Sequence, residues 1–212
     1  MPKTIIPRFA KRAALVEATL DSLGELGPSG VHPADICEEL GLSKALVNYH
    51  FGSRDGLVAE AMALGYERYV DLLEHAVGAA GTDAFERLMA FYETQVDWTI
   101  NHAGLAAALN FPSTAAGLGV DVDPVIQQRL SSAGNRNFSN LVGLVGAARR
   151  SFGHDDDPSY VAALAAMIGW SCLGTSVWFA GGHAPTRDIG LRPRPDVALA
   201  FTRTLLRRLL AA

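Results

Sequence analysis

Polar side chains gather in one short segment, residues 43–54, of a chain that is otherwise rich in apolar residues. Lys44, Asn48 and Tyr49 fall at spacings that leave them on the outward side of a helix. Lysine contacts phosphates and guanine, and asparagine pairs with the edge of adenine in the major groove. These residue types therefore indicate contact with nucleic acid, provided that a rigid scaffold presents this face outward.

The segment from His32 to Phe51 supplies such a scaffold as two short helices joined by a tight turn at Gly41-Leu42-Ser43. We expect the first helix from Pro33 to Leu40, and a second helix that Ser43 caps and that ends near Tyr49. Cys37 lies where the helices approach, so that position requires a small side chain. Four apolar residues are spaced to pack the pair together and onto the preceding helix: Ile36, Leu40, Leu42 and Val47. The pattern predicts a helix-turn-helix at about residues 32–51.

Helical periodicity covers almost the whole chain, and no run of alternating β-branched residues interrupts it. Asp123-Pro124 and Asp157-Pro158 are helix start signals, because aspartate accepts a hydrogen bond at the cap and proline fits the first turn. Besides the helix-turn-helix, we expect helices at about 10–26, 53–79, 83–101, 103–109, 123–151, 157–180 and 196–210. The sequence therefore predicts an all-α fold.

Composition limits the classes of function. The chain has 18 basic and 22 acidic residues, a formal net charge of −4, so it lacks the broad basic surface of a protein that coats nucleic acid non-specifically. Val161 to Ala180 is free of charge and long enough to span a bilayer. It is only weakly hydrophobic and has no flanking basic cluster, which favours a helix buried between its own core and a partner subunit. A membrane-associated helical protein remains the alternative.

Landmark residues at fixed spacing cover residues 8–60, and they are Arg12, Ala18, Leu20, Gly27, Asp35-Ile36-Cys37, Gly41-Leu42-Ser43-Lys44, Phe51 and Ser53-Arg54-Asp55-Gly56-Leu57. This part resembles the N-terminal domain of the TetR family of bacterial transcriptional regulators. The resemblance implies a three-helix DNA-binding domain at 8–60 and a helical ligand-binding and dimerisation domain at 61–212. It also implies a homodimer that binds a palindromic DNA operator, most often as a repressor, and that a small-molecule effector releases.

The resemblance assigns DNA contacts residue by residue. Lys44, Ala45 and Leu46 fall at positions that meet bases, and Asn48, His50 and Arg54 at positions that meet bases or phosphates. Asn48 stands where the family usually has Tyr, so the neighbouring Tyr49 either substitutes for it or packs in the core. The full expected DNA-binding set is Ser43, Lys44, Ala45, Leu46, Asn48, Tyr49, His50 and Arg54. An ordinary helical hairpin with solvated Lys44 and Arg54 is the alternative.

Three residues at the second helix depart from the family pattern. The family often has Thr at His32, and the following Pro33 and Ala34 cannot donate charged or hydroxyl contacts to phosphate. We expect weak phosphate binding by this helix. The basic arm from Lys3 to Arg12 could compensate.

Aromatic and polar residues of the second part form a stripe, which either fills the core or lines an effector cavity. The candidate lining residues are Tyr66, Met89, Tyr92, Gln95, Trp98, His102 and Phe111. Their mostly apolar character favours an uncharged or amphipathic ligand of aromatic or acyl type. For dimerisation we expect the helix at 161–180 and the last helix to pair with the same two helices of a second copy in a two-fold, four-helix arrangement, with Leu173 and Phe201 at the interface.

No motif indicates catalysis. The six histidines do not recur at helical metal-ligand spacing, and no phosphate-binding loop, dinucleotide fingerprint or nucleophile elbow is present. His154-Asp155-Asp156-Asp157 is either a metal cluster or, as we prefer, an acidic loop in which Asp157 caps a helix. We expect no catalytic residues, no metal, no cofactor and a cytoplasmic location with reduced Cys37 and Cys172. A helical enzyme without a recognisable motif remains the rival function.

Overall fold

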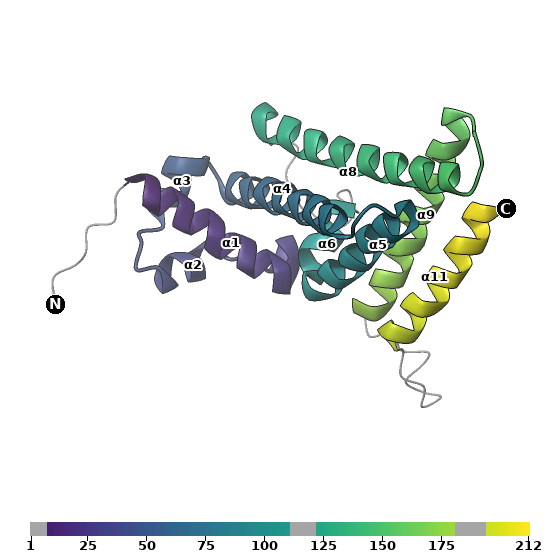
Figure 1. The fold of residues 1–212 in the computed structure, drawn as a ribbon. Helices are drawn as coiled ribbons and strands as arrows, with labels where there is room; N and C mark the ends of the chain where they lie inside the picture. The colour runs from purple at the N-terminus through teal and green to yellow at the C-terminus, as the bar shows by residue number, and fades with distance from the viewer. Residues whose placement is uncertain (1–7, 111–121, 181–193) are drawn as a thin grey trace. The chain divides into compact units, whose positions relative to one another are not determined.

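The computed structural model describes residues 8–110, 122–180 and 194–212, and every regular element in these ranges is an α-helix (Figure 1). The expected all-α class is therefore confirmed. The helices are α1 (Arg8–Gly30), α2 (Pro33–Glu39), α3 (Ala45–Phe51), α4 (Arg54–Ala79), α5 (Ala84–Asn101), α6 (Ala103–Asn110), α8 (Pro124–Ser151), α9 (Pro158–Ala180) and α11 (Pro195–Ala211).

Four helices, α4, α5, α8 and α9, start where the sequence predicts them, because capping side chains accept hydrogen bonds from backbone amides that have no partner inside the helix. Ser53 Oγ accepts from Gly56 N at 3.0 Å at the start of α4. Aspartate carboxylates do the same elsewhere: Asp83 for α5 at 2.9 Å, Asp123 for α8 at 2.8 Å and Asp157 for α9 at 2.8 Å.

The end of α1 differs from the prediction. The sequence places it at Leu26, whereas helical turns continue to Gly30 beyond a kink at Gly27. Gly27 has φ 68°, a conformation that favours glycine, so the predicted break occurs but a further turn follows it. Backbone from α6 packs directly against this kink, and a Cβ atom on Gly104 would overlap Gly27 N and Leu23 O.

The helices pack into two compact units that differ from the domains expected at 8–60 and 61–212. The first unit combines the chain up to Glu67 with His102–Ala133, and the second combines Arg68–Asn101 with Gly134–Ala212. Residues of α4 and α8 therefore belong partly to each unit.

The core of the first unit forms around α1. Leu15, Leu23, Val31 and Leu57 are fully buried. A smaller cluster joins α4 to the start of α8 through Ala59, Ala63 and Ile126. These buried contacts hold together the helices of the unit that contains the helix-turn-helix.

The core of the second unit forms around α5, which buries Phe85, Leu88, Met89, Phe91 and Tyr92 almost completely. On its α9 side, Cys172 Sγ donates to Tyr92 O at 3.7 Å and the hydroxyls of Tyr92 and Thr175 lie 3.2 Å apart. Toward α4, the rings of Tyr69 and Trp98 lie 4.2 Å apart. Helix α5 thus contacts both α4 and α9 in this unit.

The uncharged segment at 161–180 lies within α9, and it is not buried on all sides within one chain. Val161, Leu164, Ile168 and Cys172 are buried, whereas Met167 is 70% exposed and Trp170 66% exposed. Among the described residues, no helix is long and apolar enough to cross a membrane.

Candidate nucleic-acid interface

The turn between α2 and α3 is fixed by its own backbone. Gly41 has φ 61°, which reverses the chain direction at a position that favours glycine. Leu42 N donates to Cys37 O at 2.7 Å, and Leu46 N donates to Ser43 O at 3.0 Å. Both short helices are therefore held to the turn by local hydrogen bonds, as the predicted helix-turn-helix requires.

The inner side of the pair is apolar. Ile36, Cys37 and Val47 are each at most 4% exposed. Burial raises the pKa of the Cys37 thiol, which keeps it protonated and uncharged. Leu40 and Leu42 are half-buried. The residues expected to hold the helices together thus lie at or near their contact.

The outer side of α3 and its approach presents a polar face. Lys44, Ala45, Asn48 and Tyr49 are exposed, and Tyr49 exposes 61% of its surface. This exposure argues against a core role for Tyr49, whose ring meets that of His50 edge-on at 4.9 Å. Ser43 is exposed but accepts a hydrogen bond from Ala45 N at 3.3 Å. Leu46 and His50 are half-buried at the edges of the face.

Glycines set the corner between α3 and α4. Gly52 ends α3 with φ 73°, and its amide donates to Asn48 O at 3.0 Å. A Cβ atom on Gly56 would overlap Phe51 O, so the start of α4 packs against the backbone of α3 only because this residue is glycine. The corner between α3 and α4 therefore depends on two positions that favour glycine, Gly52 through its backbone conformation and Gly56 through lack of space.

Arg54 lies at the start of α4, and its guanidinium points into the protein. Nε donates to Val31 O at 3.1 Å, Nη2 donates to Pro28 O, and Nη1 pairs with Asp55 at 2.8 Å. These carbonyls follow the kink of α1, so Arg54 joins α1 to α4. The phosphate contact expected of Arg54 would therefore have to use the guanidinium N–H groups that these hydrogen bonds do not occupy.

Behind this corner, an ion-pair network joins three helices of the first unit. Glu60 of α4 pairs with Arg12 of α1 at 3.0 Å and with Arg129 of α8 at 2.8 Å. Arg129 also pairs with Glu67 at 2.7 Å, and Glu67 and Glu60 raise the pKa of its guanidinium. The Arg12 guanidinium lies 5.1 Å from the Phe51 ring, which ends α3. No pattern in the sequence indicates the partners in this network, although Glu60 and Glu67 share one face of their helix.

The residues expected to line an effector cavity are divided between the two units. Tyr66 and His102 belong to the first, where Tyr66 is half-buried and His102 is exposed. In the second unit Met89, Tyr92 and Trp98 are buried and Gln95 is half-buried. Phe111 lies outside the described residues. Tyr92 contributes both oxygens to contacts with α9, so it acts at least partly as a packing residue.

The two helices expected at a dimer interface expose apolar rows in the second unit. On α11 the exposed residues recur every four positions and are Val197, Phe201, Leu205 and Leu209. On α9 Met167 and Trp170 are exposed. Leu173 is only 7% exposed, so the expectation that it lies at the interface is wrong. The uncharged segment within α9 is apolar on every side, and its sequence therefore does not reveal which face of the helix is buried.

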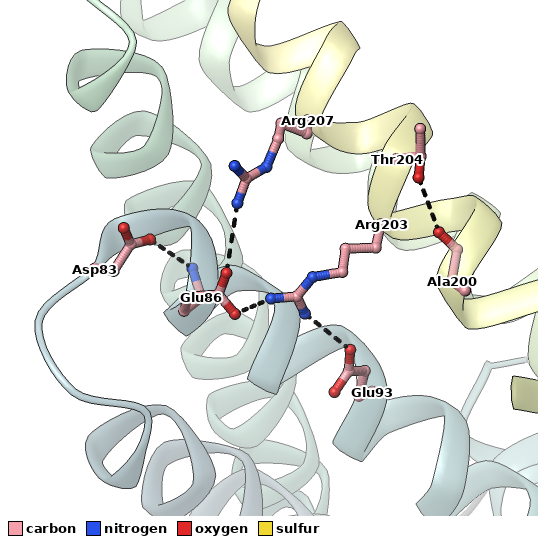
Figure 2. A network of polar contacts seen from close by, with 7 residues as sticks. All are labelled: Asp83, Glu86, Glu93, Ala200, Arg203, Thr204 and Arg207. Atoms are coloured by element: carbon pink, nitrogen blue, oxygen red, sulfur yellow. Dashed lines mark hydrogen bonds and ion pairs between the residues drawn. The ribbon is translucent and has the colours of Figure 1, made fainter.

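On the side of α11 away from its apolar row, charged residues bind this helix to α5, as Figure 2 shows. Arg203 reaches Glu86 and also Glu93, the latter at 3.3 Å, and Arg207 reaches Glu86 at 3.5 Å. Both guanidinium groups also lie over the ring of Phe85. These contacts hold α11 with its apolar row outward.

The acidic loop before α9 is used within the protein. Asp157 caps α9, as predicted, and Asp156 accepts two hydrogen bonds from the buried Arg149 at 2.6 and 2.9 Å. This contact lowers the pKa of Asp156. In the described ranges, no group of three or more His, Cys, Asp or Glu side chains is arranged to hold a metal ion.

Comparison with protein families agrees with this geometry. Residues 8–61 match the family described as bacterial regulatory proteins, tetR family. The chain is also 32% identical over 111 residues to the HTH-type transcriptional regulator BetI of Burkholderia lata. That match covers 50% of this chain and 57% of the relative, so the chain spans a little over half the length of the curated relative.

Similar solved structures extend the likeness over nearly the full chain. A Rhodococcus sp. RHA1 protein of unknown function has a TM-score of 0.75 with 21% identity, covering 95% of each chain. A bacterial regulatory protein in the tetR family from Rhodococcus RHA1 has a TM-score of 0.63 with 19% identity, covering 95% of this chain and 97% of its own. At these identities the likeness shows a shared fold.

Proposed function

The chain belongs to the tetR family of bacterial regulatory proteins, and from this premise we propose that it is a sequence-specific DNA-binding transcriptional regulator. The observation that carries the proposal is the polar outer face of α3. Lys44, Asn48 and Tyr49 are exposed on it, while Val47 on the opposite side of α3 is buried in the core. A short helix fixed in this way fits the major groove, where side chains reach base edges.

Each residue of the face has a proposed role. Lys44 and Asn48 donate to base edges or phosphates, and Ala45 and Leu46 meet thymine methyl groups or exclude water. Tyr49 supplies a hydroxyl beside Asn48, where the family usually has its own tyrosine. Ser43 and His50 border the face. Arg54 holds the corner of α1 and α4 and offers its remaining donors to phosphate.

The regulator acts as a homodimer in this proposal. The apolar row on α11, together with Met167 and Trp170 on α9, is too hydrophobic for a surface that stays in water. Pairing of α9 and α11 with the same helices of a second copy would bury these residues in a two-fold, four-helix arrangement. Two copies of α3 would then meet successive major grooves about 34–36 Å apart on a palindromic operator.

Control by a small molecule completes the proposal. The protein works in the cytoplasm as a repressor, and an effector releases it by binding the DNA-incompetent form more tightly than the competent form. Residues of α4 belong to both units, which supports this helix as the element that transmits the effect. A coupling of about 1–3 kcal/mol would lower operator affinity roughly 5–150-fold.

An electrophoretic mobility shift with the DNA upstream of the protein's own gene tests the proposal. We expect a discrete complex that survives competition by unrelated duplex and weakens as salt rises, because phosphate contacts release counterions. The double variant Asn48→Ala, Tyr49→Ala removes polar groups from the face without touching buried residues. Binding of all duplexes alike, by the wild type and by this variant, would contradict sequence-specific recognition through α3.

A further inference from the structure

A groove of about 390 Å³ lies in the second unit, where α4, α5 and α8 meet. Its apolar lining is formed by Val77, Phe91 and Leu144, one residue from each helix, all at most 8% exposed. The volume falls within the range of small-molecule sites, which are apolar with a few placed polar groups. The groove contains none of the residues that the sequence predicts as cavity lining.

Arg87 is the cation of this groove. It lies one helical turn before Phe91 on the same face of α5, and it is half-buried. Within the described part of the chain, no ion pair or side-chain hydrogen bond satisfies its guanidinium, in contrast to Arg136 and Arg149, which hold carboxylates. A partly buried guanidinium is stabilised by an anion that accepts two parallel hydrogen bonds, and a carboxylate has that geometry.

Glu74 also lines the groove, and it is paired with Arg136, which pairs with Asp71 as well. Arg136 donates to both of its oxygens, at 2.7 and 3.0 Å, and Asn140 donates at 2.8 Å. These contacts lower the pKa of Glu74, so the residue is an anion committed to its own partners. Of the two charged residues that line the groove, Glu74 is thus held by Arg136 and Asn140, whereas no described side chain pairs with Arg87.

Glycine keeps the groove open on the α8 side. Gly143 lies in the middle of α8, where glycine destabilises a helix relative to alanine. A Cβ atom there would meet no atom within 4 Å, so neighbouring helices do not require glycine at this position. Gly104 is the opposite case, because backbone of α1 excludes a side chain there. A larger residue at 143 would project into the free volume.

We propose that this groove binds a small amphipathic carboxylate, with the carboxylate on Arg87 and the apolar chain or ring against Phe91, Val77 and Leu144. The sequence predicts an uncharged or amphipathic ligand. Because Arg87 supplies a positive charge, the groove favours an amphipathic ligand that is an anion. That such a ligand acts as the effector rests on the proposed function, whereas binding itself does not.

The first test measures binding of matched acid and amide pairs to the full-length protein without DNA. Suitable probes are octanoate with octanamide, 4-phenylbutyrate with 4-phenylbutanamide, and 2-naphthoate with 2-naphthamide, each titrated by calorimetry. We expect at least one acid to bind about ten-fold or more tightly than its amide, because the hydrogen bonds to Arg87 are charge-assisted. Equal binding within every pair, or binding of none, overturns the proposal.

Two variants and one control locate the site. Arg87→Gln removes the charge and should remove the preference for the acid, while Gly143→Leu fills the groove and should weaken the acid and the amide alike. Arg150→Gln removes a positive charge from an exposed position of the same unit, outside the groove, and should bind as the wild type does. Circular dichroism establishes that each variant is folded. Wild-type affinities in both folded groove variants overturn the proposal.

DNA binding is scored separately on the same preparations. Acid binding that depends on Arg87 supports the site even if no duplex is bound, a result that would sink only the proposed function. Specific binding of DNA together with failure of every acid leaves the proposed function standing and removes the groove as an anion site. If the acid is the effector, adding it should release the operator from the wild type but not from Arg87→Gln.

Discussion

The outward faces of α3 and α11 differ in chemical character and therefore suit different partners. Both helices bury one side in their own unit, α3 through Val47 and α11 through Leu206 and Leu210. On the other side α3 exposes Lys44, Asn48 and Tyr49, whereas α11 exposes a row that includes Phe201 and Leu205. The polar face suits a partner rich in hydrogen-bond acceptors, and the apolar row suits a second protein surface. The residues that stay exposed after packing therefore indicate the kind of partner that each helix suits.

Charging the apolar faces should have the largest effect. The double variant Trp170→Glu, Phe201→Glu places carboxylates where a second copy would pack, so we expect monomers in sedimentation at micromolar concentration. Specific DNA affinity should fall on the order of a thousand-fold, toward non-specific binding, because a single half-site remains.

Phe138→Glu is the matched control for this variant. It charges an aromatic residue of α8 that is 44% exposed in the same unit, and it should leave the dimer intact. A well-folded wild-type monomer at the same concentration would contradict the assignment of α9 and α11 to dimerisation.

Removing polar groups from α3 should have the next effect. Lys44→Ala and Asn48→Ala should each cost about 1–3 kcal/mol of binding free energy if the side chain meets a base, and each should relax sequence preference at that base. Competition titrations with single-base variants of the operator measure both effects. Arg150→Gln serves as the charge control, and a loss of the same size in that variant would remove the special role of α3.

Arg54 joins α1 to α4 within the fold, and its substitution should affect stability. Arg54→Ala leaves the carbonyls of Pro28 and Val31 without their donor, so we expect the free energy of unfolding to fall by about 1–3 kcal/mol. Arg54→Lys keeps the charge but cannot span both carbonyls, and it should lose a similar amount. Denaturant titration measures this loss, and full stability in both variants would show that the contacts with α1 are unimportant.

The smallest expected effect concerns the ion pairs on the surface of the second unit. Because Arg136 and Asn140 lower the pKa of Glu74 in the folded protein, the stabilisation is present above the unfolded pKa of about 4.3 and is lost as pH falls through the folded value. Arg136 is 41% exposed, so Arg136→Gln should cost less than about 1 kcal/mol at neutral pH. The difference between variant and wild type should shrink in acid, and a difference that grows would reverse the assigned sign.

Local signals allowed much of the fold to be predicted from sequence. Asp123 and Asp157 act through amides only two residues away, so each cap is visible in the sequence and is confirmed by its hydrogen bond. The break near Gly27 is local in the same sense. The outward set on α3 follows from helical spacing once the buried residues are known, and its contacts with DNA stay a prediction.

Features that depend on distant residues escaped sequence analysis. Arg54 donates to Pro28 and Val31, more than twenty positions away, and no local pattern links them. Leu173 and Trp170 lie in a segment that is apolar all round, so only packing against α5 distinguishes the buried residue from the exposed one. The groove beside Arg87 needs three helices that lie far apart in the chain.

Selection from a library of random duplexes tests whether α3 recognises a specific DNA sequence. Wild-type protein is incubated with the library at low salt, bound duplexes are amplified over several rounds, and the double variant Asn48→Ala, Tyr49→Ala is carried in parallel. We expect enrichment of one palindromic sequence by the wild type, with half-sites about one helical turn or a multiple apart, and loss or change of that sequence in the variant. A wild type that enriches no sequence, or a variant that enriches the same sequence equally well, would contradict recognition of DNA by α3.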